Sequence, residues 1–538
     1  MAQAEQGMKW AAAAQAMLLA CACTAQAGWM PVSREVERPF AAELGRWKSG
    51  VHTAIRPYRI KDLRAIDSED SLRPHAAVPA LDRWAGARNG RRFRWGPLFD
   101  LQGGVGMDSV QVVTHRFGGG AWLEGDVGDR LTLHASGQLW NERYPRYMDS
   151  LARATQMSAG EGYAHQEGNA FTHGDWNAYA SWDPGKYFNF TLGRGKHFIG
   201  EGHRSLFLSD EASAYPYLRI TTSVWRAKYV NLFTMMNDIR GAQGDPSRFQ
   251  RKYASMHYLS VNASRRINLA LFEAIVWSQG DSLYPRGFDV NYLNPIIFYR
   301  PVEFAHGSPD NALLGFSASV KAGHHTLFYA QVMLDEFLLR EVRAGDGWYA
   351  NKQALQAGVV ARNAFKVDGL TLRGEWNMVR PFMYTHSDTR QNYAHFGQPL
   401  AHPYGSNFQE ALGHIEWSRA RMLYALRGSL AWLGSDSTES WGNNIFRPES
   451  DRPNLPNYGY RNYNYRIGEA IEYTLFQGEL RAGWLIDPAS ATRIEASWIS
   501  RSRTREAGPP DWQHAFRIGI SCWFRERHAE QEPRYVLN

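Results

Sequence analysis

Two short stretches of the sequence combine the residue types of a hydrolytic active site. GEGHRSLFLSD supplies Glu201, His203, Ser205 and Asp210, and FAHGSPDN supplies His306, Ser308 and Asp310. A serine attacks a substrate only when a base lies within hydrogen-bond reach of its hydroxyl, and closeness in sequence does not guarantee that geometry. Because the chain contains 18 histidines, some fall beside serine and aspartate by chance. We therefore predict that the protein is not an enzyme.

Sequence motifs for metals and nucleotides are absent. The chain contains no CxxC, HExxH or GxxxxGK[ST] pattern, which are arrangements that hold metal ions or cradle phosphates. The glycines of LGRGKHFIGEG lack the strand-turn-helix context of a nucleotide site, and glycine in a strand often marks a bend. We expect no metal and no cofactor.

Arginines, histidines and tyrosines offer binding chemistry instead. An arginine grips a carboxylate at two points, and an aromatic face provides a flat apolar platform for a sugar ring. This combination favours an acidic polysaccharide as the ligand. The candidate contact residues are Arg194, Lys196, His197, Arg204, Arg300, Glu303, His306, Asp310, Tyr393, His395 and His402. For any one of them, an equally good interpretation is a ladder of arginines and carboxylates that fills the protein interior.

The elements that must position these residues are strands. In RLTLHASGQLW, in IEYTLFQGELRAGWLI and in FRIGISCWF, apolar and polar residues alternate, which is typical of a half-buried strand. These segments approach about ten residues, the length of a tilted membrane-spanning strand. Tryptophans gather near their ends, as in the aromatic girdles of membrane barrels. An open sheet edge is unstable in lipid, so the pattern predicts an all-β, closed antiparallel transmembrane barrel. A soluble exported β-protein is the alternative.

The chain divides into four expected regions. Residues 1–27 resemble an export signal, with Lys9, an apolar run and Ala25-Gln26-Ala27 before a cleavage point. Residues 28–95 look helical or irregular and are expected at the periplasmic end or partly inside the barrel. Residues 96–524 form the barrel, and 525–538 form a charged tail. After cleavage Cys522 is the remaining cysteine, so no disulfide scaffold is predicted.

The connections between strands come in two lengths. Short ones such as DVGDR, DPGK and ASRR are expected to be periplasmic turns, and long ones are expected to be outer loops at the cell surface. The long ones are about 141–174, 237–251, 279–310, 381–410 and 434–469. The last contains NLPNYGYRNYNYR, whose asparagines and tyrosines suit contact with sugar. The net charge of +7 is spread along the chain, so nucleic acid is not expected as a partner.

Three blocks of the sequence carry a family resemblance. LGRGKHFIGEGHRSLFLSDEASAYPYLRITTSVWRAKYVNLF, YLNPIIFYRPVEFAHGSPDNALLGFSASVK with YAQVMLDEF after it, and QNYAHFGQPLAHPYGSNFQE resemble Wzi-like capsule-assembly outer-membrane proteins. The likeness extends from about Phe40 to Phe524 and is strongest to a Bacteroidetes branch that includes a gliding-motility protein. It implies a barrel of about 16 to 18 strands with helical elements at the periplasmic end.

The resemblance also implies a role. The capsule branch implies a lectin-like barrel that holds capsular or exopolysaccharide on the cell without cutting it, embedded in the outer-membrane lipid of a Gram-negative bacterium. The gliding branch implies an accessory component of motility, protein secretion or adhesin display. A porin-like channel or a barrel enzyme is a second alternative. One feature departs from the family pattern: the chain continues past Phe524 with RERHAEQEPRYVLN, whereas such barrels usually end on an aromatic residue.

Overall fold

The computed structural model describes residues 28–522, apart from 48, 61, 64–91, 109–110, 129, 243–244, 281–286, 297–309, 337, 488–489 and 507. The expected signal peptide and the charged tail lie outside these residues. So do Arg300, Glu303, His306 and Ser308 from the predicted sites.

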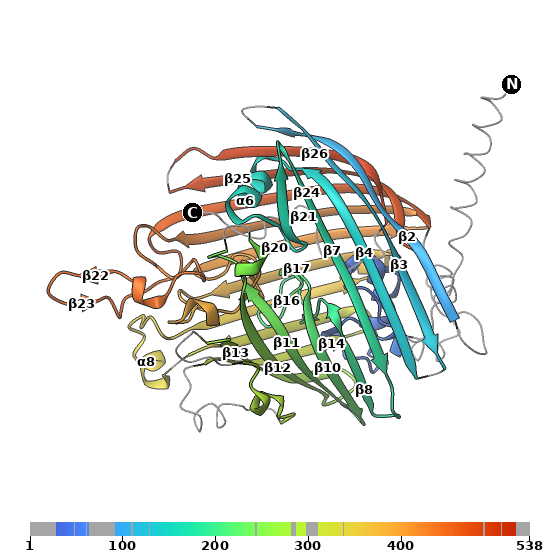
Figure 1. Cartoon of the computed structure of the whole chain (residues 1–538), viewed down its shortest axis with the longest axis horizontal. Coiled ribbons are helices and arrows are strands. Elements are labelled where there is room, and N and C mark those ends of the chain that lie inside the picture. The colour runs from blue at the N-terminus through green and yellow to red at the C-terminus, as the bar shows by residue number, and fades with distance from the viewer. Residues whose placement is uncertain are drawn as a thin grey trace.

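The chain forms a closed antiparallel β-barrel of 18 strands, which confirms the predicted fold (Figure 1). Each strand pairs with the next along the wall, and β26 pairs with β2 from Asp100↔Ser521 to Met107↔His514, which closes the barrel. The wall strands are β2 (Arg92–Met107), β3 (Val112–Val127), β4 (Leu131–Arg143), β7 (Ala170–Trp182), β8 (Phe188–Gly195), β10 (Tyr215–Val224), β11 (Ala227–Asp238), β12 (Gln250–Asn262), β13 (Ile267–Ser278), β14 (Asn311–Ala322), β15 (Thr326–Leu334), β16 (Gln353–Arg362), β17 (Leu370–Val379), β20 (Phe408–Arg419), β21 (Met422–Ser435), β24 (Ile471–Asp487), β25 (Thr492–Arg505) and β26 (Asp511–Ser521).

Smaller elements lie in the connections. The helices are α2 (Arg34–Glu37), α3 (Ala41–Gly45), α6 (Arg146–Thr155) and α8 (Leu339–Ala344), and short strand pairs are β1 (Ile55–Arg56) with β9 (Phe198–Ile199), β5 (Met157–Ser158) with β6 (Gly162–Glu167), β18 (Ala394–His395) with β19 (Gln398–Pro399) and β22 (Asn454–Leu455) with β23 (Gly459–Tyr460). Within the described residues, no helix is long and apolar enough to cross a membrane.

The two faces of the wall differ as the alternation predicts. On β24, Leu480 is 60% exposed on the outer face, whereas its neighbours Glu479 and Arg481 are buried inside. On β26, Ile518 faces outward and Arg517 is buried. An exposed apolar band around a closed barrel is the surface that lipid tails cover.

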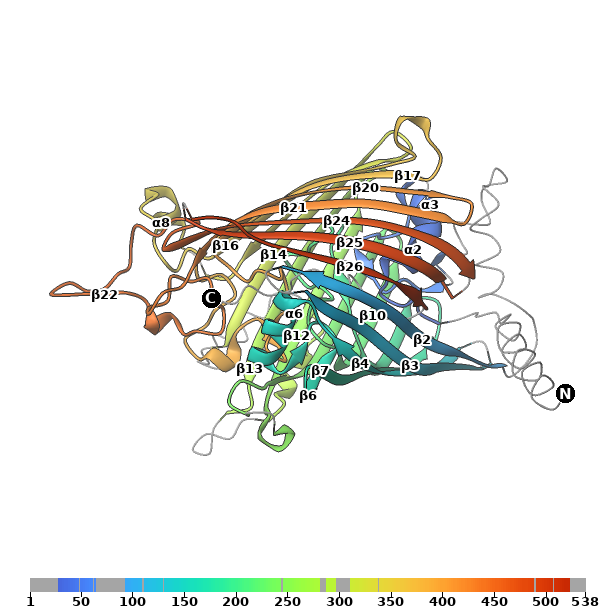
Figure 2. The ribbon, with the colours of Figure 1, turned by 90° about the horizontal axis from the view of Figure 1, so that it is seen from above.

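The connections separate into a short-turn end and a long-loop end, at opposite ends of the barrel (Figures 1 and 2). At the short-turn end, Trp225 and Arg226 alone join β10 to β11, and Ala420 and Arg421 join β20 to β21. Helices α2 and α3 lie inside this end of the barrel in Figure 2. The long-loop end contains α8, β22 and β23 (Figure 1).

Two connections fold into the barrel rather than over its rim. Leu206, Phe207 and Leu208 of the segment 196–214 are fully buried, and Phe207 stacks on Phe272 of β13 with ring centres 4.9 Å apart. Segment 380–407 packs against it, because Tyr393 donates from its hydroxyl to the Phe207 carbonyl at 2.7 Å. The sequence predicted an outer loop at about 381–410, and that prediction is wrong for most of this range. Its apolar side chains complete a core inside the barrel.

The N-terminal segment is fastened inside the short-turn end by ion pairs. Glu35 of α2 pairs with Arg38, with Arg493 of β25 at 2.6 Å and with Arg427 of β21 at 3.6 Å. Burial alone would raise the pKa of the Glu35 carboxyl, but these guanidinium groups outweigh burial and hold that pKa well below its usual value. Beside these pairs, Met30, Val36, Phe40, Leu44 and Tyr58 form a small apolar core.

Candidate functional site

A cluster of aromatic residues and arginines lies at the long-loop end, on the loop that follows β21 and on the loop before β16. We call it the loop patch. Its members are Tyr349, Trp441, Arg452, Tyr458, Tyr460, Arg461, Asn462, Tyr463 and Tyr465. Tyr458 is 86% exposed and Tyr460 is 49% exposed, so part of the patch offers open aromatic surface to solvent.

Arg452 lies between two tyrosines of the loop patch. Its guanidinium carbon is 4.1 Å from the centre of the Tyr349 ring and 5.0 Å from that of Tyr460. Its terminal nitrogens donate to the Glu449 carbonyl and to the Asn462 side-chain oxygen, each at 3.0 Å. In the described part of the chain it has no carboxylate within salt-bridge distance. Stacking and these two hydrogen bonds hold the cation in place without neutralising it.

Arg461 forms a second stacked cation with a different partner set. Its guanidinium carbon is 4.8 Å from the ring centres of both Trp441 and Tyr465. Unlike Arg452, it also pairs with a carboxylate, that of Glu469 at 2.7 Å. This arginine therefore holds the loop together, and Arg452 is the cation that remains available to an anionic ligand.

Hydrogen bonds hold the two patch-bearing loops to each other. The main-chain nitrogens of Asn464 and Tyr465 donate to the carbonyls of Asp346 and Gly347 at 2.7 and 3.0 Å. At the base of the loop, Asp436 accepts from the main-chain nitrogens of Trp441 and Asn443 at 2.9 and 3.0 Å. Burial raises the pKa of the Asp436 carboxyl. The patch is therefore supported by a hydrogen-bonded loop base.

Two of the predicted ligand residues meet at a buried carboxylate. Arg204 reaches Glu410 of β20 at 3.1 Å, and the His402 Nε2 atom lies 2.8 Å from the same carboxylate. All three side chains are buried. They form an internal ion-pair network, the arrangement that the sequence left open as the alternative to ligand contact. They connect the two inward segments to the wall.

The other described candidates are also engaged within the protein. Lys196 donates to the carbonyls of Gly160 and Asp210, His395 accepts from the main-chain nitrogen of Asn237, and Asp310 accepts from the Tyr292 hydroxyl at 2.6 Å. Tyr393 is fully buried, and His197 is buried against Tyr215 and Tyr217.

Arg194 is placed differently. It shares the outward face of β8 with Leu192, where its guanidinium lies over Trp176 at 4.7 Å and donates to Asp175 at 2.9 Å. It is therefore a residue of the outer wall near the long-loop end, apart from the buried candidates.

The hydrolase-like grouping is not assembled around its serine. The Ser205 hydroxyl donates to the Ile199 carbonyl at 2.5 Å and accepts from the main-chain nitrogen of Phe207 at 3.1 Å. The ring of His203 packs edge-on against His414, with ring centres 4.4 Å apart. Ser205 therefore shapes the inward turn.

One group of side chains has the composition of a metal site. Glu142, Glu161 and His173 place their ligand atoms within 4.8 Å of one another. Arg116 pairs with both carboxylates and reaches Glu161 at 2.6 Å. The guanidinium already supplies the positive charge that a metal would bring, so this group has the character of an ion-pair cluster.

Known proteins with a similar structure show which class of fold this barrel belongs to. A closed barrel with an apolar outer band belongs to the class of outer-membrane β-barrels. No protein-family model matches the chain, and no curated protein matches it by sequence. Among solved structures it is similar to Wzi of Escherichia coli, described as an outer-membrane, carbohydrate-binding β-barrel involved in group 1 capsule assembly. The TM-score is 0.54 at 13% identity, covering 91% of this chain and 98% of that one.

Two structures from Pseudomonas aeruginosa are also among the matches. OprD of Pseudomonas aeruginosa gives a TM-score of 0.42 at 9% identity, covering 80% of this chain and 94% of that one. The OpdK protein of the same organism gives 0.42 at 7% identity, covering 80% and 98%. At 13% identity, the similarity to the Wzi structure shows the shared barrel fold alone.

Proposed function

We propose that this protein holds capsular or exopolysaccharide at the cell surface, as a lectin-like barrel without catalytic turnover. In this proposal it lies in the outer membrane of a Gram-negative bacterium, with its long-loop end facing outward. The loop patch is the observation that carries the proposal. It combines exposed tyrosine faces, an asparagine and a stacked arginine without a carboxylate partner, a set that suits uronate-containing sugar chains.

The filled barrel supports a holding role over a conducting one. Segments 196–214 and 380–407 pack an apolar core across the interior, and α2 and α3 fill the short-turn end. A polymer bound at the loops would meet many weak contacts along its length, and their combined avidity exceeds that of any single contact. The similarity to a carbohydrate-binding barrel is consistent with this role.

The predicted ligand residues take two roles in the proposal. Arg194 sits on the outer wall beside Trp176, where surface polymer or lipid could meet it. The buried residues Arg204 and His402 position the inward segments that support the loops. Arg300, Glu303 and His306 keep their predicted role as ligand contacts, and the branch assignment and the motility role stay predictions.

The test compares polysaccharide held on cells with polysaccharide released. Cells lacking the gene are complemented with the wild type or with Arg452→Gln combined with Tyr458→Ala. We expect the variant to shift polymer from the cell-bound to the released fraction without changing the total. Removing the cation and the most exposed aromatic platform weakens retention but not synthesis.

Matched controls come from elsewhere on the same barrel. Tyr187 is 48% exposed at the short-turn end, and Arg343 is exposed on α8 outside the loop patch. Tyr187→Ala combined with Arg343→Gln should leave retention at the wild-type level. Normal retention in the patch variant would contradict the proposal. Normal retention combined with lost surface spreading in the deletion strain would favour the motility role instead.

A further inference from the structure

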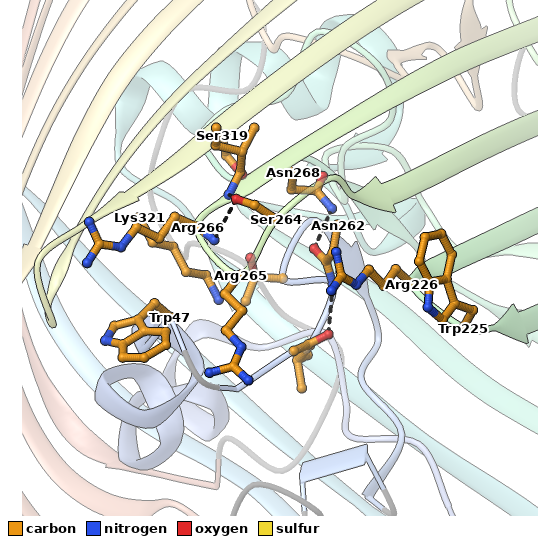
Figure 3. Close-up of a pocket in the computed structure, with 14 residues that line it drawn as sticks. Trp47, Trp225, Arg226, Asn262, Ser264, Arg265, Arg266, Asn268, Ser319 and Lys321 are labelled. Carbon is orange, nitrogen blue, oxygen red and sulfur yellow. Dashed lines mark hydrogen bonds between the residues drawn. The ribbon is translucent and has the colours of Figure 1, made fainter.

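A second candidate site lies at the short-turn end, in a cavity of about 500 Å³ between the N-terminal segment and the barrel wall (Figure 3). Its floor is polar. Asn262 donates to the Gly50 carbonyl at 2.9 Å, and Asn268 donates to Asn262 at 2.9 Å. Lys321 closes one side, where its ammonium group donates to the carbonyls of Leu44 and Arg46. The cavity is therefore built by fixed contacts between the wall and the segment inside it.

Three arginines without acidic partners surround the cavity mouth: Arg226, Arg265 and Arg266. All three are exposed, and in the described chain none of them has a carboxylate within salt-bridge distance. Arg265 and Arg266 lie 5.7 and 5.9 Å from the Trp47 ring centre, and Arg226 lies 5.2 Å from that of Trp225. Figure 3 shows Arg226 and Arg265 between the two tryptophans. Uncompensated cations around a polar cavity create a site for an anion.

The apolar neighbours of these arginines identify the kind of anion. Trp225, in the β10–β11 turn, is 87% exposed, and Val224 before it and Ile267 at the start of β13 are also exposed. Ile267 and Trp225 also line the cavity. The cavity wall thus continues into the lipid-facing surface, at the level where tryptophan rings meet headgroups. An anion attached to acyl chains would reach the arginines while its chains follow that surface.

We propose that this cavity binds the phosphodiester headgroup of a phospholipid from the adjacent membrane leaflet. Arg226, Arg265 and Arg266 would grip the phosphate oxygens, and Trp47 and Trp225 would border the headgroup. The proposal is independent of the glycan-holding role at the opposite end, because it uses neither the loop patch nor the outer face of the loops.

The test is lipid titration of the full-length, detergent-purified barrel by native mass spectrometry. The probes are dioleoyl phosphatidylglycerol, dioleoyl phosphatidylethanolamine and dioleoylglycerol, which lacks a phosphate. We expect both phospholipids to bind and dioleoylglycerol not to bind. Replacing Arg226, Arg265 and Arg266 by glutamine should raise the Kd for phosphatidylglycerol by roughly a hundredfold, because each basic side chain near the headgroups adds to the attraction.

A control variant removes the same number of charges from the same end. Arg130, Arg419 and Arg421 are exposed at other short turns outside the cavity, and their triple glutamine variant should bind phosphatidylglycerol as the wild type does. Folding of each variant is checked by its heat-modifiable migration on gels. Equal weakening in both variants would overturn the proposal, because it would indicate general charge attraction.

Two soluble competitors separate the lipid from other anions. Glycerol phosphate carries a phosphate group without acyl chains, and trigalacturonate represents an acidic glycan. We expect neither to displace phosphatidylglycerol at equal concentration. Binding of glycerol phosphate as tight as that of the lipid would make this a site for free phosphate, and displacement by trigalacturonate would make it a glycan site. Either result would overturn the lipid assignment.

Discussion

Arginine is used in opposite ways in the anchor of the N-terminal segment and in the loop patch around Arg452. At the short-turn end, Arg493 and Arg427 are buried and paired with carboxylates of the wall and with Glu35 of the N-terminal segment, so their charges are neutralised within the protein. At the long-loop end, Arg452 is held by tyrosine rings and neutral acceptors. An arginine that pairs with a carboxylate has a structural role, whereas an arginine without a carboxylate partner is available to a ligand. Arg226 and its neighbours at the cavity mouth follow the same rule.

The largest effect is expected from removing the Glu35 carboxylate, which anchors the N-terminal segment. Glu35→Gln leaves the guanidinium groups of Arg38, Arg427 and Arg493 without their shared partner. We expect the free energy of unfolding to fall by about 2–3 kcal/mol. The guanidinium groups keep their pairs with Glu416, Glu479 and Glu495, but each loses a buried charge-assisted contact. Chemical unfolding of the detergent-solubilised barrel measures this loss. Glu167→Gln, at an exposed glutamate of β6, should change stability little.

The Glu35 carboxylate also makes the stability of the folded barrel depend on pH. Because the pKa of Glu35 lies well below its usual value in the folded protein, its stabilising contribution is complete above the unfolded-state pKa of about 4.3. The contribution is lost as the pH falls from there through the folded-state pKa. Unfolding measured from pH 7 to pH 3 should show the wild type losing more stability than Glu35→Gln. Parallel curves for the two proteins would contradict this assignment.

A smaller effect is expected at the long-loop end, on ligand affinity rather than stability. Arg452→Gln should weaken binding of an acidic oligosaccharide by roughly tenfold, since a charge-assisted contact contributes on the order of 1–2 kcal/mol. The loss should shrink as salt is raised, because salt screens an exposed charge. Isothermal titration at two ionic strengths measures both. An unchanged affinity would exclude Arg452 from the site.

The substitution Arg452→Lys separates the effect of the positive charge from that of the planar guanidinium group. Lysine keeps the charge but loses the planar group that stacks between Tyr349 and Tyr460, so we expect affinity between those of the wild type and Arg452→Gln. Affinity equal to that of the wild type would mean that charge alone matters at this position. The same titration decides between these results.

The smallest effect on glycan affinity is expected from a control substitution at the short-turn end. Tyr187→Ala changes an aromatic residue whose exposure is close to that of Tyr460, but at the short-turn end. Glycan affinity should stay within about 0.5 kcal/mol of the wild-type value, as for most surface substitutions. A larger loss would show that glycan binding is not confined to the long-loop end.

The strands of the barrel wall could be predicted from the sequence because the alternation of apolar and polar residues is visible within each short segment. Alternation along β24 and β26 fixes which side chains meet lipid, and backbone hydrogen bonding in lipid then demands closure. The inward course of segments 196–214 and 380–407 obeys no such periodic rule. Arg204 and Glu410 are 206 positions apart, so nothing near either residue in the sequence reveals their pairing.

The loop patch was only partly visible in the sequence. NLPNYGYRNYNYR indicated a sugar-suited loop and contains Tyr458, Tyr460 and Arg461. Tyr349 and Arg452, which form the stacked cation, lie outside that run, and Tyr349 comes from a different loop. The patch depends on main-chain hydrogen bonds between the two loops, and composition does not encode such pairing.

The ion pair between Glu35 and Arg493 also constrains the order of assembly. These residues are 458 positions apart, and Arg493 lies on β25, one strand before the last. The N-terminal segment precedes β25 in the chain, so this contact of its anchor forms only once β25 has been made. The contacts of Glu35 with Arg38 and with Arg427 of β21 do not require β25. A chain truncated before β25 would lack both the β26–β2 seam and this ion pair, so the Glu35–Arg493 contact reports that the barrel wall has been built as far as β25.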